Sequence, residues 1–309
     1  MMTYSKSIKG DLMLLLAALI WGSTFVAQST GMQYIGPYTF NTLRSLIAIF
    51  VLLPIVLLFS RNAKEKKGQG LWQQLKPGRK TLQGGLVAGV ILGIASNLQQ
   101  VGISMTTAGK AAFITALYLV LVPVFDRISG GVVTKRVWIC VVVAIYGFYL
   151  LSVQEDFTIA LGDILVFLCS IFFALHILCI DRFLRKGADS IQMSWVQFGI
   201  AFLISGVLTL LFECLNLSAI WDAKVSILYA GVLSSGGAFT LQILGQKYTK
   251  PTSATLLMSL ESIFAALSGW LVLGETLTGR EFLGCVLVFM AAILSQIPLT
   301  RLFKLSHNL

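Results

Sequence analysis

The stretch TSATLLMSLESIFAALSGWLVL, residues 252–273, decides the class of fold. It is apolar over a length that lets a helix cross a bilayer, for which about 20 residues suffice. Its only charged residue is Glu261, close to the middle. A charge at the centre of a membrane helix costs about 2.5–3.5 kcal/mol on insertion scales. A carboxylate at this position therefore requires either a partner within the protein or a function.

Nine other stretches of the chain are similarly apolar, and the composition agrees with them. The 309 residues are 57% hydrophobic and 12% charged, with a mean hydropathy of +0.86. Soluble chains are about 45–50% apolar and about 25% charged. The sequence therefore predicts an all-α integral membrane protein. Its ten transmembrane helices are expected at residues 11–29, 38–59, 82–103, 107–129, 136–153, 159–180, 191–212, 225–245, 252–273 and 282–299.

Basic residues are concentrated on one side of this predicted topology. If the N-terminus is cytoplasmic, 19 of the 23 Lys and Arg residues fall in the cytoplasmic loops and the two terminal segments. The outer loops hold three, and Arg44 lies within a span. Membrane proteins carry this excess of basic residues on the cytoplasmic side. Topology thus explains the net charge of +10 without a nucleic-acid partner, and both termini are predicted to be cytoplasmic.

Each of two sequence blocks occurs twice, in the same order. The first pair is GDLMLLLAALIW at 10–21 and GDILVFLCSIFF at 162–173, and the second pair is GISMTTAGKAAFITALY at 102–118 and GQKYTKPTSATLLMSLE at 245–261. The second alignment matches Gly102 with Gly245. We therefore expect two five-helix halves, residues 10–153 and 159–299. Because five is an odd number of spans, the halves would cross the membrane in opposite directions, as the inverted repeats of transporters do.

Polar side chains recur within the predicted spans. Every polar group in hydrocarbon needs a partner or water, so their number predicts a hydrated central cavity. The candidate substrate-binding residues are Trp21, Thr24, Asn97, Gln100, Tyr118, His176, Trp195 and Gln242. Arg44 and Glu261 are the two strongly ionisable residues that lie deepest in spans, and we expect them to pair or to form part of the cavity wall.

Each of these residues also has a purely structural interpretation. Glu261 is either a buried carboxylate that accepts hydrogen bonds from a neighbouring helix or a protonatable group that couples substrate movement to a proton gradient. Arg44 either lines the cavity or extends its side chain toward the outer surface. His176 either bonds a backbone carbonyl or faces the cavity. The aromatic residues either pack in the core or stack on an organic ligand.

Signals of catalysis and of bound cofactors are missing from the sequence. It contains no HExxH, no GxSxG and no Asp-rich metal cluster, and AGKAA at 108–112 lacks the glycine spacing of a P-loop. The five cysteines form no CxxC pair and are expected to be small packing residues. We therefore expect neither an enzyme nor a cofactor or metal site.

The block SLESIFAALSGWLVLGETLTGREFLGCVLVFMAAIL, residues 259–294, resembles the second-half signature of the EamA family in the drug/metabolite transporter superfamily. GISMTTAGKAAFITALYLVLVPVF, residues 102–125, resembles its first-half counterpart. The resemblance implies a ten-helix permease of two inverted repeats around a central cavity, with motif glutamates at Glu261 and Glu275. Where the family has a proline after the first glutamate, this chain has Ser262, so no proline is present to break the helix there.

These observations predict a secondary active transporter in the cell membrane. It would move a small metabolite, such as an amino acid or a drug, by alternating access around the cavity. Coupling to protons through Glu261 is one interpretation. A passive facilitator would use the same polar cavity and stays an alternative, whereas the missing motifs disfavour a membrane-embedded enzyme. The metabolite and the lipid bilayer are the partners that we expect.

Overall fold

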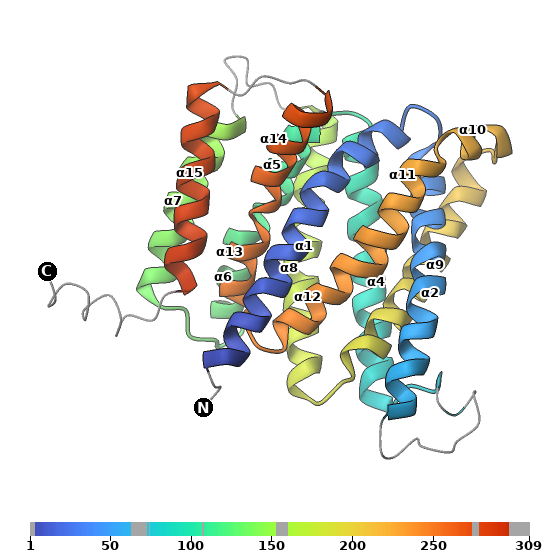
Figure 1. Ribbon diagram of the computed structural model, residues 1–309, viewed down its shortest axis with the longest axis horizontal. Coiled ribbons are helices and arrows are strands. Elements are labelled where there is room, and N and C mark those ends of the chain that lie inside the picture. Colours follow the sequence, from blue (N-terminus) through green and yellow to red (C-terminus); the bar gives the residue numbers. More distant parts are fainter. Residues whose placement is uncertain are drawn as a thin grey trace, which may run out of the picture.

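The computed structural model describes residues 4–62, 73, 75–106, 108–152, 160–273 and 278–296. Within these ranges every regular element is a helix (Figure 1). The elements in chain order are α1 (Tyr4–Gly31), α2 (Pro37–Asn62), α4 (Arg79–Ile103), α5 (Ala108–Thr115), α6 (Tyr118–Ile128), α7 (Lys135–Ser152), α8 (Leu161–Arg185), α9 (Ser190–Phe212), α10 (Leu217–Asp222), α11 (Lys224–Leu228), the π-helical η2 (Tyr229–Ala238), α12 (Phe239–Gln246), α13 (Pro251–Met258), α14 (Glu261–Ser268), the π-helical η3 (Gly269–Leu273) and α15 (Gly279–Gln296). Glu275 lies outside the described residues.

Eight helical segments of the described chain are long and apolar enough to cross a membrane. Many of their outward side chains are large and apolar: Phe50, Leu210 and Leu271 are 64%, 78% and 72% exposed. Such a surface is stable against hydrocarbon rather than against water. α15 adds a shorter apolar helix, and α7, of 18 residues, packs beside it. The predicted all-α, multi-pass membrane fold is confirmed for the described residues.

Short-range signals explain where several helices begin. α2 starts at Pro37, whose missing N–H is tolerated in a first turn. The N–H groups of Tyr38 and Thr39 donate to the two carboxylate oxygens of Glu213, at 2.9 and 2.8 Å. Asp189 caps α9 by accepting a backbone N–H of its first turn. Side-chain oxygens thus satisfy backbone donors that the helix itself leaves unpaired.

Two spans are interrupted near their middle. α5 ends at Thr115 and α6 begins at Tyr118, while α13 ends at Met258 and α14 begins at Glu261. At both interruptions a backbone N–H bonds the carbonyl three residues earlier, the pattern of a tight 3₁₀ turn. Each of these two spans therefore consists of two half-spans joined by a break.

The second break occurs although no proline is present. Ser259 Oγ donates to the carbonyl of Leu256 at 3.0 Å, and a serine that bonds the backbone in this way competes with regular helical bonding. Ser262, at the position of the family's proline, donates through Oγ to the carbonyl of Ala112 on α5 at 3.2 Å. Serine hydroxyls are therefore found at this interruption, which the sequence did not predict because it has no proline there.

Close helix packing brings the two broken spans together. α5 packs against α14, and α6 packs against α13. In Figure 1 the first of these pairs lies near one end of the bundle and the second near the other. α4 packs against α8 and α9, and its glycine face carries the contact with α9: a Cβ on Gly89 would lie 2.8 Å from the carbonyl oxygen of Gln197. Small residues at this spacing let helix backbones approach.

Candidate functional site

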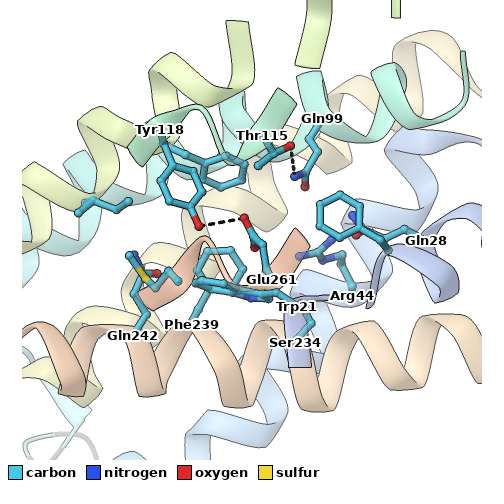
Figure 2. A pocket seen from close by; sticks show the side chains of 14 residues that line it. Trp21, Gln28, Arg44, Gln99, Thr115, Tyr118, Ser234, Phe239, Gln242 and Glu261 are labelled. Atoms are coloured by element: carbon cyan, nitrogen blue, oxygen red, sulfur yellow. Dashed lines mark hydrogen bonds between the residues drawn. The ribbon is translucent and has the colours of Figure 1, made fainter. Parts of the chain in front are cut away.

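A cavity lies where the two broken spans meet (Figure 2). Thr115 and Tyr118 flank the first break, Met258 and Glu261 flank the second, and all four line the cavity. The other lining residues are Trp21, Phe25 and Gln28 of α1, Arg44 of α2, Gln99 of α4, Phe173 and Ile177 of α8, Ser234 of η2, and Phe239 and Gln242 of α12. Helices from both halves of the sequence therefore contribute to one central site.

The space inside this cavity is small. Its free volume is about 40 Å³ once the size of a water molecule is allowed for. A single water requires about 10–15 Å³ on that measure. The cavity as it stands admits a few water molecules, and a metabolite of the size of an amino acid enters only if the walls move apart.

Glu261 lies at the start of α14 with its carboxylate in the cavity, and it is 4% exposed (Figure 2). The hydroxyl of Tyr118 donates to Glu261 Oε1 at 2.9 Å. Because Tyr118 is the first residue of α6, this hydrogen bond joins the residues that follow the two breaks. The first turn of a helix also favours negative charge through the helix dipole. The expected hydrogen bond from a neighbouring helix is therefore present.

Arg44 is 5% exposed, so its side chain does not extend to the outer surface. Its Nε donates to Ser235 Oγ at 2.9 Å, while Nη1 has no hydrogen-bond partner among the described residues. Arg44 and Glu261 line the same cavity, yet no ion pair of the described chain joins them. A guanidinium and a carboxylate are thus held apart in one buried space, where electrostatic interactions are strong.

An aromatic wall separates the cavity from a second polar pair. The rings of Trp21 and Phe239 meet edge to face, with centroids 4.9 Å apart. Phe239 also contacts His176, at 6.1 Å between centroids, and Phe198, at 5.6 Å. His176 is fully buried, and its Nε2 lies 3.0 Å from Gln197 Oε1. The ring of Phe239 therefore stands between the cavity and the hydrogen-bonded pair of His176 and Gln197.

Amide side chains supply much of the remaining polarity. Gln99 Nε2 donates to a threonine hydroxyl of α5 at 3.1 Å, and Gln28 Nε2 donates to Gln100 Oε1 at 2.7 Å. Gln242 Oε1 and Trp21 Nε1 are buried without a hydrogen-bond partner in the part of the chain that the structure describes. Since buried polar atoms are usually paired, this acceptor and this donor are available to a ligand or to water.

Half of the predicted site residues meet on the cavity wall. These are Trp21, Arg44, Tyr118, Gln242 and Glu261. The residues that the structure places away from the wall are Thr24, Asn97, Gln100, His176 and Trp195. Hydropathy shows that a span contains a polar residue, but it does not show toward which neighbour that residue points.

The residues away from the wall have other neighbours. Thr24 Oγ1 donates to a carbonyl of its own helix at 2.6 Å. Asn97 Nδ2 donates to Ser205 Oγ at 2.8 Å, between α4 and α9. Gln100 accepts its hydrogen bond from a lining residue, and Trp195 packs against the hydrophobic cluster that contains Phe239.

Nine residues of the wall were not predicted as site residues: Phe25, Gln28, Gln99, Thr115, Phe173, Ile177, Ser234, Phe239 and Met258. Gln28 and Gln99 are polar residues within spans, so a signal for them existed. Phe239 is an apolar residue in an apolar span, and nothing in the sequence distinguishes it from its neighbours. Only the packing of α12 against α1 reveals its position.

A bundle of apolar helices around a buried cavity lined by charged, polar and aromatic side chains defines a multi-pass membrane protein with a polar site in its core. Among the described residues no group of three or more His, Cys, Asp or Glu side chains could hold a metal ion. The model of the EamA-like transporter family matches residues 8–153 and 160–296. The chain therefore belongs to the EamA family of membrane transporters.

Similar proteins cover nearly the whole chain. An uncharacterized transporter of Archaeoglobus fulgidus is 33% identical over 294 residues, which are 94% of this chain and 86% of that protein. The uncharacterized transporter YoaV of Bacillus subtilis is 23% identical over 303 residues, 95% of this chain and 99% of its own. A solved crystal structure shares the fold, with a TM-score of 0.72 at 17% identity over 93% of this chain and 96% of its own.

Proposed function

We propose that the protein is a secondary active transporter that moves a small zwitterionic metabolite, such as an amino acid, by alternating access. The observation that carries this proposal is the presence of a basic and an acidic side chain, Arg44 and Glu261, on the wall of one buried cavity. Burying an ion without a partner is expensive, and a zwitterion offers a partner to each of them. A neutral or singly charged solute would satisfy one at most.

The positions of the other polar atoms suit the same ligand. A carboxylate can accept hydrogen bonds from Arg44 Nη1 and Trp21 Nε1, the two donors that lack a partner among the described lining residues. An ammonium group can donate to Glu261 and to Gln242 Oε1. The rings of Trp21 and Phe239 offer an apolar and aromatic surface to the rest of the molecule. The substrate class is therefore amphipathic as well as zwitterionic.

We assign the alternating opening of the cavity to two inverted halves of five spans each, residues 10–153 and 159–299. Together they give ten spans. The family model matches the chain twice, once in each half. Tyr118 and Glu261 occupy equivalent positions in the repeat, and each follows a break. The equivalent half-spans α5 and α13 lie near opposite ends of the bundle (Figure 1). Transporters of this plan bind substrate between their halves, at discontinuous helices near the midplane.

Proton coupling is assigned to Glu261. A protonated carboxyl no longer attracts an ammonium group, so a proton and the substrate compete for the same side chain. Because the site faces each side of the membrane in turn, this competition exchanges a proton for a substrate molecule across the membrane. A proton gradient can then drive the substrate against its own gradient.

The orientation in the cell membrane follows from charge. Loops rich in Lys and Arg are retained in the cytoplasm, which supports cytoplasmic positions for both termini. The first turns of α1 and the last turns of α15 lie toward the same end of the bundle (Figure 1). Both observations are consistent with an even number of spans.

The test is transport by the purified protein in proteoliposomes. We expect a labelled amino acid to accumulate above its external concentration when a pH gradient is imposed, and the accumulation to collapse with a protonophore. Equilibration without accumulation would indicate a passive facilitator instead. Conversion of the solute into a product would indicate an enzyme.

Glu261→Gln separates coupling from binding. The variant is expected to lose accumulation driven by the pH gradient while it still exchanges internal for external substrate, at a raised KM. The amide oxygen of glutamine still accepts a hydrogen bond from the ammonium group, and exchange needs no net proton movement. Asp222→Asn is the matched control, since it neutralises an exposed carboxylate at the end of α10, away from the cavity. Full gradient-driven accumulation by Glu261→Gln would exclude this carboxylate as the proton carrier.

A further inference from the structure

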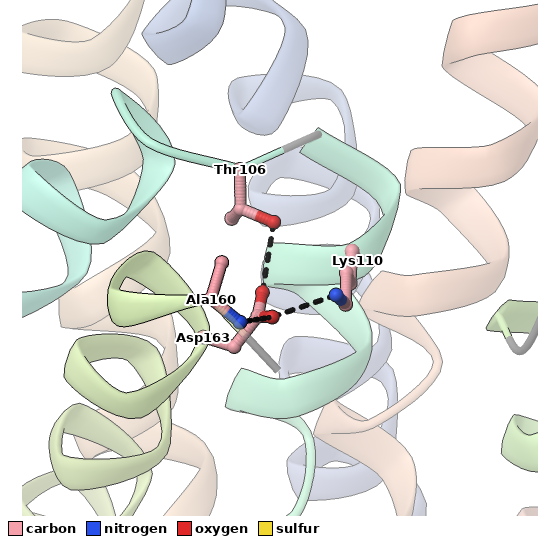
Figure 3. A network of polar contacts seen from close by, with 4 residues as sticks. All are labelled: Thr106, Lys110, Ala160 and Asp163. Atoms are coloured by element: carbon pink, nitrogen blue, oxygen red, sulfur yellow. Dashed lines mark hydrogen bonds and ion pairs between the residues drawn. The ribbon is translucent and has the colours of Figure 1, made fainter. Parts of the chain in front are cut away.

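Just before each broken span, a threonine donates a hydrogen bond to an aspartate of another helix. On α8, Asp163 accepts hydrogen bonds from Thr106 Oγ1 at 2.9 Å and from Lys110 Nζ at 2.6 Å (Figure 3). On α1, Asp11 accepts a hydrogen bond from Thr249 Oγ1 at 2.9 Å. Thr106 lies just before α5, and Thr249 lies just before α13. We call these contacts the Asp163 clamp and the Asp11 clamp.

The two clamps share an Asp–Thr hydrogen bond beside a close approach of two glycines. A Cβ on Gly162 would lie 3.0 Å from the carbonyl oxygen of Gly102, and a Cβ on Gly10 would lie 3.0 Å from that of Gly245. In both places the glycine before the aspartate lets its helix lie close to the end of α4 or of α12. The clamped threonine follows that end. The repeated sequence blocks align the four glycines, the two aspartates and the two threonines with one another.

Helix capping does not explain the shared contact. Asp163 also accepts the N–H of Ala160 at 2.8 Å and so caps the start of α8. Asp11 lies well inside α1, which begins at Tyr4, and has no such role there. Both aspartates accept a hydrogen bond from the threonine that lies just before a half-span.

Each clamp is connected to the cavity by one half-span. α5 leads from the Asp163 clamp to the break before Tyr118, and α13 leads from the Asp11 clamp to the break before Glu261. A break lets a half-span move without the rest of its span. The two half-spans lie near opposite ends of the bundle (Figure 1), so release of either clamp frees a different end of the cavity.

We propose that Asp163 and Asp11 are positioning residues for transport, each of which keeps closed the end of the cavity at which it lies. The Asp163 clamp breaks when the cavity opens at its end, and the Asp11 clamp breaks when the cavity opens at the other. Both are intact here, in agreement with a cavity too small for a metabolite. The role in transport rests on the proposed function, whereas the control of opening is testable without it.

The experiment uses one reporter and two equivalent substitutions. Ser234, which lines the cavity and is 1% exposed, is replaced by cysteine in a chain whose five native cysteines have been removed. A membrane-impermeant maleimide is applied to either face of membrane vesicles. Thr106→Val and Thr249→Val each remove one hydroxyl donor at nearly constant volume, so each variant is the matched control of the other.

The two variants should shift labelling in opposite directions. With the proposed orientation, Thr106→Val raises labelling from the outer face relative to the inner face, and Thr249→Val does the reverse. The shift for Thr249→Val should be about tenfold, because a hydrogen bond to a charged group changes an equilibrium by about that factor. The shift for Thr106→Val should be smaller, because Lys110 still holds Asp163. Loss of structural support alone would change labelling from the two faces equally.

Equal shifts from both faces, or none, overturn the inference. Thermal unfolding of each variant shows that it is folded. If a valine variant is not, Asp163→Asn and Asp11→Asn take its place and must give the same opposite shifts, while Asp163→Glu should restore the original ratio. Labelling needs no known substrate. A failed clamp therefore leaves the transport assays to decide the proposed function, and a protein without transport can still show opposite shifts.

Discussion

Gly22 of α1 lies close against α14, the helix that carries Glu261. A Cβ at Gly22 would collide with Phe264 Cβ and would lie 2.6 Å from the carbonyl oxygen of Glu261 and 2.8 Å from the nitrogen of Ala265. Ordinary Cβ contacts begin at 3.4 Å, so relief of the 2.6 Å approach requires α1 and α14 to separate by about 0.8 Å. Gly22→Ala therefore displaces the carboxylate without changing its chemistry.

The expected loss follows from this displacement. Extra volume in a packed core typically costs about 1–3 kcal/mol, and we expect the free energy of unfolding in detergent to fall by that amount. Misplacement of a functional group by about 1 Å reduces enzyme rates by about 10²-fold. We expect the initial rate of transport into proteoliposomes to fall by at least about tenfold, since the Tyr118–Glu261 hydrogen bond is stretched as well.

Gly199→Ala in α9 is the matched control, because a Cβ there would meet nothing within 4 Å. It should transport normally and gain up to about 1 kcal/mol of stability from helix propensity. Wild-type transport and wild-type stability in Gly22→Ala would refute the reasoning. An equal loss in both variants would show that the effect is not specific to the contact between α1 and α14.

Three further substitutions test the cavity wall. Tyr118→Phe removes the hydroxyl that bonds Glu261, and thermal unfolding should show that the free energy of unfolding falls by about 1.5–3 kcal/mol. In a Glu261→Gln background the acceptor is neutral, and the same substitution should lower the free energy of unfolding by only about 1 kcal/mol. Arg44→Lys keeps the charge but loses the planar fork, so the KM for substrate should rise about tenfold with less change in maximal rate, and an unchanged KM would contradict contact with the ligand. Phe239→Leu thins the wall between the cavity and His176, and efflux from preloaded proteoliposomes without a pH gradient should increase; unchanged efflux would show that the ring is no barrier.

The membrane fold was predictable because a bilayer imposes one strong requirement on sequence. A spanning helix must be apolar over about 20 residues, and stretches such as 252–273 can be recognised in the sequence by this property alone. The repeated blocks also predict a register in which Tyr118 matches Glu261. The break before Glu261 was not predictable, because it is a tight turn accompanied by serine hydroxyls, and no proline marks it in the sequence.

The site was predictable only in part, for a physical reason. Polarity within a span identifies residues that need a partner, as it did for Arg44 and Glu261. It does not say whether the partner is the same helix, as for Thr24, or a neighbouring helix, as for Asn97. Phe239 needs no partner at all, so its place between the cavity and His176 follows from packing alone.

The central claim is that two halves cross the membrane in opposite directions and that their broken spans meet at the cavity. Ser104 and Lys247 are exposed and occupy equivalent positions in the turns before α5 and α13. Each is replaced by a single cysteine in a chain without native cysteines and is treated with an impermeant maleimide on intact cells. The account predicts that Ser104→Cys is labelled from outside and Lys247→Cys only after the cells are opened. Labelling of both from the same face would contradict it.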